Sequence, residues 1–177
     1  MSSPSVKNII LLFALFFIHS NVFAYEEENK VICAITSKIA KFTQKNNSDI
    51  NPYTITVLNN QFGDLCTDMY KDTKINNKDV QVLYFDDIHN LKQTNILFIF
   101  DTPIDQLDEI LSYIKNKHIL TISTMRGFAQ RGGMVQIYSQ NQKLKLKINL
   151  DSVKQEKIYI HSALLRIANI IRGDRND

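Results

Sequence analysis

After residue 24, the residues best suited to chemistry are three histidines and one pair of carboxylates, and they are scattered along the chain. His89, His118 and His161 stand singly, and no two lie at metal-ligand spacing with a third ligand nearby. We therefore expect structural roles for them. Asp86-Asp87 follows a predicted strand, where α/β proteins place functional carboxylates. Since no second carboxylate cluster accompanies this pair, we interpret it as the start of a solvated loop, and we predict no metal site.

Motifs for nucleotide binding and nucleophilic catalysis are absent from the sequence: there is no Gly-x-Ser-x-Gly elbow, phosphate loop or dinucleotide fingerprint. Arg131-Gly132-Gly133 precedes a predicted strand, so it cannot place a phosphate on a helix N-terminus. It forms either a tight turn that needs positive φ or a loop that contacts a ligand. Without a concentrated set of titratable groups, the sequence predicts a binding protein with no cofactor, and not an enzyme.

Two cysteines, Cys33 and Cys66, are the only thiols in the chain. In an oxidising compartment an even pair favours a disulfide, which would contribute roughly 3–4 kcal/mol in the chain-entropy model. Alternatively, Cys33 is a buried free thiol, because it lies beside the apolar stripe of a predicted helix. Both interpretations stay open at the level of sequence.

Apolar periodicity predicts an alternation of helices and strands. Apolar residues three and four apart indicate helices, and short β-branched or wholly apolar runs indicate strands. Thr102, Pro103 and Asp105 predict a capped helix start after one such strand, and Ser162 predicts another. The predicted helices cover residues 29–45, 62–70, 103–114 and 162–173, and the predicted strands cover 53–58, 80–85, 95–100, 118–123, 133–138 and 143–150.

This alternation predicts an α/β fold with a mostly parallel sheet that helices cover on both faces. The strictly alternating segment 143–150 and the preceding strand predict an antiparallel hairpin near the C-terminus. We find no internal repeat and no convincing domain boundary, so residues 25–177 are predicted to form a single domain.

The N-terminus has the three-part layout of a secretory signal peptide. Lys7 supplies a positive charge, the apolar run 9–18 follows, and Ala24 offers a small residue before an acidic stretch. A helix of ten residues spans about 15 Å, too short for a bilayer core of about 30 Å. We expect cleavage after residue 24 and a mature protein that does not span a membrane and lies outside the cytoplasm, which in a diderm bacterium means the periplasm.

Lys and Arg together number 21 and Asp and Glu number 18. We expect this small excess of positive charge to be spread along the chain. A small, spread excess argues against a nucleic-acid partner.

The C-terminal half carries an ordered series of short motifs. They are Gly127-Phe128-Ala129, Arg131-Gly132-Gly133-Met134, Ile148-Asn149-Leu150 and Ser162-x-x-Leu165-Arg166-Ile167-Ala168, preceded by Ala40-Lys41-Phe42-Thr43 and Phe62-Gly63. With the signal peptide, this series resembles the YfiR/HmsC-like family of periplasmic proteins over residues 34–171. The chain departs from the family at Thr94-Asn95, where many members carry a cysteine, so a bridge from Cys66 to that position is excluded.

The resemblance implies a homodimeric regulator that binds the periplasmic sensor domain of an inner-membrane diguanylate cyclase. Such a regulator keeps the cyclase inactive, and its release raises cyclic-di-GMP and favours biofilm growth. The alternative is a small-ligand binding protein, whose site we would expect at the carboxyl ends of the strands.

Candidate partner-binding residues follow from the motifs and from the enrichment of aromatic residues and Arg among interface hot spots. Alternatively, Phe128 packs in the core, Asn149 satisfies backbone groups and Arg166 pairs with a nearby carboxylate. The candidates are Phe128, Arg131, Met134 and Arg166.

Overall fold

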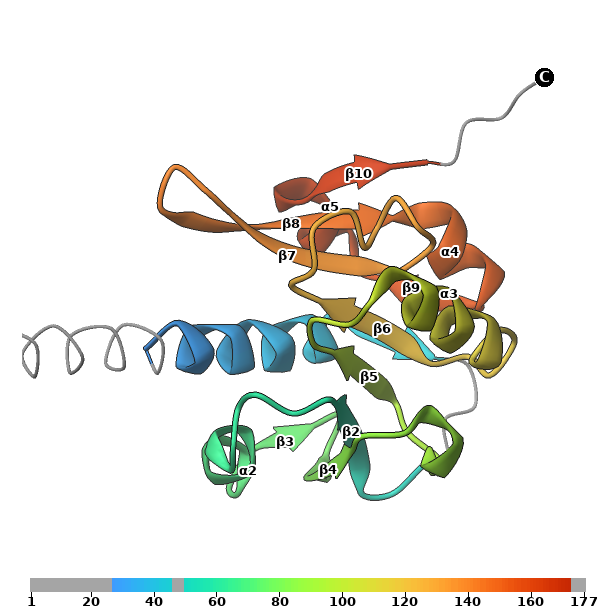
Figure 1. Cartoon of the computed structure of the whole chain (residues 1–177). Coiled ribbons are helices and arrows are strands. Elements are labelled where there is room, and N and C mark those ends of the chain that lie inside the picture. Colours follow the sequence, from blue (N-terminus) through green and yellow to red (C-terminus); the bar gives the residue numbers. More distant parts are fainter. Residues whose placement is uncertain (1–26, 46–49, 173–177) are drawn as a thin grey trace, which may run out of the picture.

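The computed structural model describes residues 27–45 and 50–172 (Figure 1). The predicted signal peptide, residues 1–24, lies outside the described residues. Among the described residues, no helix is both long enough and apolar enough to cross a membrane.

An eight-stranded sheet forms the centre of the fold, in the order β10-β8-β7-β6-β5-β2-β4-β3. The neighbours β4, β2, β5, β6 and β7 run parallel, and so does β10 beside β8, whereas β7–β8 and β3–β4 are antiparallel. Figure 1 shows the sheet curling from β3 and β4 at one end to β10 at the other. The predicted α/β fold with a mostly parallel sheet is confirmed.

Ten strands are described, eight in this sheet and two in a small antiparallel pair, β1 with β9. Their bounds are β1 (Thr43–Lys45), β2 (Tyr53–Leu58), β3 (Lys74–Ile75), β4 (Lys78–Phe85), β5 (Ile96–Ile99), β6 (Leu120–Ser123), β7 (Val135–Gln140), β8 (Lys143–Asn149), β9 (Ile158–Ile160) and β10 (Asn169–Ile171).

The helices connect these strands. A helix over residues 27–41 precedes β1. The others are α2 (Leu65–Tyr70), the 3-10 turn η1 (Ile88–Asn90), α3 (Ile104–Tyr113), α4 (Leu150–Gln155) and α5 (Ser162–Ile167).

The central strands β2, β5 and β6 are buried along their whole length, as expected for parallel strands covered on both sides. Alternate residues of β5 enter two separate apolar clusters. Ile96 and Phe98 pack with residues of the 27–41 helix and α2, whereas Leu97 and Ile99 pack with α3. The strand period of two therefore divides the core between the two sides of the sheet.

The start of α3 differs from the prediction. Pro103 is the residue that precedes the helix, and no side chain caps it. The Thr102 hydroxyl instead donates to the Phe100 carbonyl at 2.8 Å and accepts from the Asn59 amide at 3.0 Å. Thr102 therefore fastens the end of β5 to the end of β2.

The C-terminal segment differs most from the prediction. The predicted helix over residues 162–173 ends at Ile167, and residues 169–171 form β10 beside β8. His161, not Ser162, caps α5, because its ring nitrogen accepts from the Ala163 N–H at 3.2 Å. Helix α4 and strand β9 lie where no element was predicted.

Candidate functional site

The turn over residues 126–132 is built around a buried phenylalanine. Phe128 is completely buried, and a Cβ at Gly133 would lie 2.2 Å from its ring. Gly132 has a φ of 102°, which an L side chain rarely adopts. The tight-turn interpretation of Arg131-Gly132-Gly133 is therefore confirmed: Gly132 supplies the backbone conformation, and Gly133 leaves room for the ring.

Buried hydrogen bonds join the sequence motifs in space. The Asn149 amide donates to the Ala129 carbonyl at 2.8 Å, and its oxygen accepts from the N–H groups of Asp151 and Ser152 at 3.1 Å. The Asn149 N–H donates to the Met134 carbonyl at 2.9 Å. The interpretation that Asn149 satisfies backbone groups is confirmed, and this residue caps α4 while holding the turn.

The four candidate partner-binding residues divide by exposure. Phe128 is fully buried and Met134 is 4% exposed, so neither offers a surface to a partner, and the core interpretation of Phe128 is correct. Arg131 is exposed and lies 3.6 Å from the Asp108 carboxylate, an exposed pair of small energetic value. Arg166 is exposed on α5, and no carboxylate among the described residues forms an ion pair with it.

The two cysteines are joined in the structure. Cys33 on the 27–41 helix and Cys66 on α2 form a disulfide, with a Cα–Cα distance of 5.7 Å, and both are buried. The hydroxyl of Tyr70, also on α2, donates to the Cys33 carbonyl. Burial raises the pKa of Tyr70, and the nearby Tyr84 adds to this effect. The bond therefore ties the 27–41 helix to α2 inside the core.

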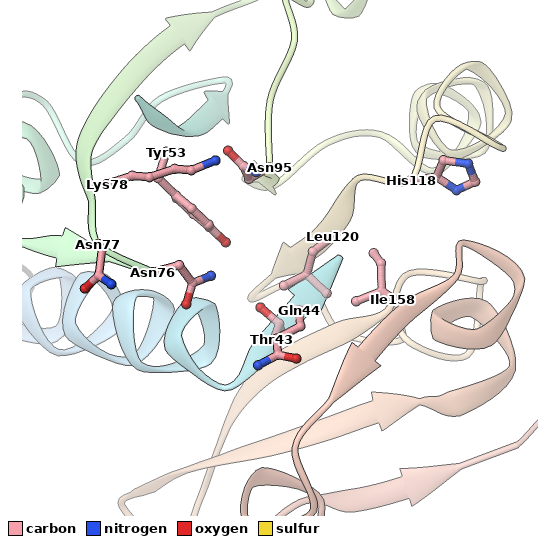
Figure 2. Close-up of a pocket in the computed structure, with 10 residues that line it drawn as sticks. All are labelled: Thr43, Gln44, Tyr53, Asn76, Asn77, Lys78, Asn95, His118, Leu120 and Ile158. Carbon is pink, nitrogen blue, oxygen red and sulfur yellow. The ribbon is translucent and has the colours of Figure 1, made fainter. Parts of the chain in front are cut away.

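A cavity of about 430 Å³ lies at the amino ends of the parallel strands (Figure 2). Tyr53 begins β2, Asn95 precedes β5 and Leu120 begins β6, and all three line it. Burial raises the pKa of Tyr53 to about 12, and a hydrogen bond with Thr43 offsets part of that rise. The other lining residues are Thr43, Gln44, Asn76, Asn77, Lys78, His118 and Ile158.

Little in the sequence predicts this cavity. Asn76 and Asn77 both have positive φ, which marks the tight turn between β3 and β4. The Asn-Asn pair therefore indicated a turn, but no local pattern places it beside Asn95 or His118. His118 itself is held through its ring nitrogen, which lies 2.9 Å from the Glu156 carbonyl.

A smaller hollow of about 210 Å³ lies at the opposite, carboxyl end of β2, where a ligand site was expected. Its lining includes Asp87, whose carboxylate accepts from the His89 N–H at 2.9 Å and lies 2.9 Å from the His89 ring. These hydrogen bonds lower the pKa of Asp87, the backbone one most. Asp87 precedes η1 and is exposed, so the loop-start interpretation is confirmed. No group of residues in the described ranges could hold a metal ion.

Two solved structures resemble this chain in fold, although their sequence identity to it is low. One similar solved structure is the ABC domain in complex with L-Trp from Streptococcus pneumonia, with a TM-score of 0.52, 11% identity and coverage of 76% of this chain and 60% of that one. Another is a conserved domain protein from Vibrio cholerae, with a TM-score of 0.51, 9% identity and coverage of 78% and 59%. This chain thus spans about 60% of either. No curated protein matches the sequence.

The fold and the turn define a class: an α/β protein with a mostly parallel sheet, in which the sequence motifs of residues 127–134 and 148–150 meet in one buried junction. Residues 29–169 match the YfiR/HmsC-like family model, and the chain belongs to that family. The resemblance inferred from the motifs is therefore confirmed, and the family is one of periplasmic regulators, not of enzymes.

Proposed function

We propose that this protein is a periplasmic regulator that represses an inner-membrane diguanylate cyclase by binding its periplasmic sensor domain. It would thereby control cyclic-di-GMP and biofilm formation. The observation that carries this proposal is the family match over residues 29–169. We also propose that the protein is exported by means of a cleaved signal peptide and acts as a homodimer.

The mechanism that fits such a regulator is a shift of population. A membrane cyclase has active and inactive arrangements, and a bound protein favours one only through its differential affinity for the two. Reversing a 1:99 ratio of the two arrangements needs a difference of about 5.5 kcal/mol between the binding free energies for them. An interface of about 1,600 Å² of total buried surface can supply this.

Arg131 and Arg166 are the exposed members of the predicted partner-binding set, and we propose them as partner contacts. Beside Arg166, Ile167 is 73% exposed, the highest fraction among the exposed large apolar side chains of the described residues. Arg is enriched at the cores of protein interfaces and among their hot spots. Phe128, Met134 and Gly133 would act indirectly, by holding the turn that carries Arg131.

The test removes the protein from its own cells and measures cyclic-di-GMP. We expect the level to rise, and we expect tagged protein to recover a diguanylate cyclase from solubilised inner membrane. The double variant Arg131→Glu, Arg166→Glu should lose both effects while keeping the melting temperature. Lys92→Glu, also on the surface, is the matched control. Unchanged cyclic-di-GMP together with recovery of no cyclase would overturn the proposal.

A second candidate function is small-ligand binding in the cavity of Figure 2. Its volume of about 430 Å³ falls in the range of ligand pockets, and amide, hydroxyl and ammonium groups line it. Native mass spectrometry of the purified protein tests this function. A retained small molecule that is lost in Asn95→Leu would support it, and a bare mass in the presence of periplasmic extract would count against it.

A further inference from the structure

Charge is segregated along the chain, contrary to the even spread expected from its total. Residues 110–172 contain eleven Lys and Arg against two Asp and Glu, a net charge of +9, whereas residues 50–109 contain four against ten, a net charge of −6. In the sheet order, β6, β7, β8 and β10 belong to the basic segment, and β2 to β5 belong to the acidic one. The molecule is therefore a strong electrostatic dipole across the sheet.

The basic residues of β8 share one face of the sheet. Leu144, Leu146 and Ile148 alternate into the apolar core. Since successive side chains of a strand point to opposite faces, Lys143, Lys145 and Lys147 lie on the other face. The Lys147 ammonium lies 5.3 Å from the centre of the Tyr138 ring on β7. Figure 1 shows the β7–β8 hairpin reaching out beyond the rest of the sheet.

The neighbours of these lysines on the same face carry no negative charge. On β7 they are Gln136, Tyr138 and Gln140, and on β10 they are Asn169 and Ile171, from the pairing registers. None of the ion pairs found among the described residues involves the three lysines.

The base of this face is closed and its outer part is open. Gln136 and Asn149 are buried beneath the turn over residues 126–132, which also carries the exposed Arg131. Beyond that turn, Lys143 and Lys145 are exposed, and Tyr138 and Lys147 are half-buried. We call the open part, formed by Tyr138, Gln140, Lys143, Lys145 and Lys147, the lysine face.

We infer that the lysine face docks on the surface of an anionic phospholipid bilayer. Lysine is a strongly hydrated point charge and is depleted from the centres of protein interfaces, so a row of lysines on a flat strand fits a diffuse anionic surface better than a specific protein pocket. Three lysines at alternate positions span about 13 Å, close to one Debye length in about 0.1 M salt, so they act together. Tyr138 is of the type that favours the polar edge of a membrane.

The dipole also sets an orientation. With the basic strands toward the bilayer, the acidic segment of β2 to β5 lies at the far edge of the sheet, which lowers repulsion from the anionic lipid. The inference goes beyond the proposed function and relies on it only for placing the protein beside the inner membrane. The test below contains no cyclase, so its result is independent of that function.

The experiment is sedimentation of purified protein lacking residues 1–24 with vesicles of phosphatidylethanolamine and phosphatidylglycerol. We expect binding in low salt, loss of binding in about 1 M salt, where the Debye length is only about 3 Å, and none to vesicles of phosphatidylcholine alone. Replacing Lys143, Lys145 and Lys147 together by Gln should lower the partition coefficient roughly 100-fold, or about fivefold per lysine.

The matched control is Lys38→Gln, Lys71→Gln, Lys92→Gln, which removes the same charge from exposed positions outside the basic strands. It should keep the wild-type partition coefficient, and circular dichroism should show that both triple variants are folded. No binding to the anionic vesicles, or equal loss in both variants, would overturn the inference. The inference is also overturned if the lysine-face variant keeps the wild-type partition coefficient on the anionic vesicles.

Discussion

At the scale of single residues, the motifs that identify the family serve mainly to build a junction. Phe128 packs against the backbone of Gly133, and Asn149 donates a hydrogen bond to the Ala129 carbonyl next to Phe128. The sequence suggested a partner contact for Phe128 because aromatic residues are frequent both in cores and in interfaces. Only burial separates the two roles, and burial depends on residues far away in the sequence.

Gly133→Ala should destabilise the protein by about 3 kcal/mol. The backbone of Gly133 does not have positive φ, so the whole effect comes from the added methyl group, which would overlap the Phe128 ring at 2.2 Å. Urea unfolding measures the change as a lower midpoint with an unchanged slope.

A double variant tests whether the Phe128 ring is what the added methyl group meets. Phe128→Leu removes the ring edge, so adding Gly133→Ala to it should cost about 1–2 kcal/mol less than in the wild type. Gly132→Ala is the comparison, because its Cβ would meet nothing within 4 Å and its strain comes only from a φ of 102°. Gly132→Ala combined with Phe128→Leu should therefore be additive, and strict additivity of the Gly133 pair would disprove the packing role.

The raised pKa of Tyr53 predicts that the protein loses stability in alkali. Burial raises its pKa from 10.0 to about 12, so between these values the unfolded chain gives up a proton that the folded chain keeps. The contribution is present below pH 10.0 and falls as pH rises, by about 1.4 kcal/mol per pH unit, until the folded group itself ionises near pH 12. Tyr53→Phe should flatten this part of the curve of unfolding free energy against pH.

The control for this pH effect is Tyr159→Phe, at a side chain that is 56% exposed. It should follow the wild-type curve between pH 10 and pH 12, the range set by the pKa of Tyr53. At neutral pH, Tyr53→Phe should cost about 1 kcal/mol for its hydrogen bond with Thr43. If Tyr53→Phe leaves the slope of unfolding free energy against pH unchanged in alkali, the Tyr53 hydroxyl does not stay protonated in the folded state.

At the scale of elements, the strands that are buried on both faces were predictable, because an apolar run such as residues 95–100 has one favourable environment. The predicted strands 53–58 and 118–123 also match β2 and β6 closely. The C-terminal prediction was wrong where Ala168 to Ile171 continued the apolar period of α5. A β-branched pair, Ile170-Ile171, suits a strand as well as a helix, and only the free edge of β8 decides between them.

The polar linkers were predictable only in part. Asn149 is both the last residue of β8 and the cap of α4, so the alternation of the strand hid the helix start. The pairing of β1 with β9, with Thr43 opposite Ile160, joins residues more than a hundred positions apart. No local pattern contains such a pairing, and for the same reason the residues of the amino-end cavity could not be assembled from the sequence.

The disulfide between the 27–41 helix and α2 should set the stability of that pair of elements. The double variant Cys33→Ala, Cys66→Ala should lower the free energy of unfolding by roughly 3–4 kcal/mol, because the bond closes a loop of 33 residues' separation. Reduction of the wild type should give a similar loss, and the variant should not respond to reductant. If the reductant destabilises the variant equally, the effect does not come from this bond.

At the scale of the whole molecule, the fold separates charge that the total conceals. A net charge of +3 is the sum of an acidic segment that supplies one edge of the sheet and a basic one that supplies the other. Opposite charges on neighbouring elements stabilise a fold, whereas like charges gathered on one face repel each other. The lysine face therefore works against the stability of the β7–β8 hairpin, which is typical of a surface that serves binding.

This conflict gives the last prediction. Lys145 lies between Lys143 and Lys147 on the same face of β8, about 7 Å from each along the strand. Lys145→Glu should therefore raise the free energy of unfolding in low salt by about 0.5 kcal/mol, and about 1 M salt should remove the gain by screening. Lys71→Glu, in the acidic segment, should lower it instead. Lys145→Glu should also weaken vesicle binding, so a variant more stable in low salt would bind less. If Lys145→Glu loses stability equally at both salt concentrations, local packing and not charge governs this face.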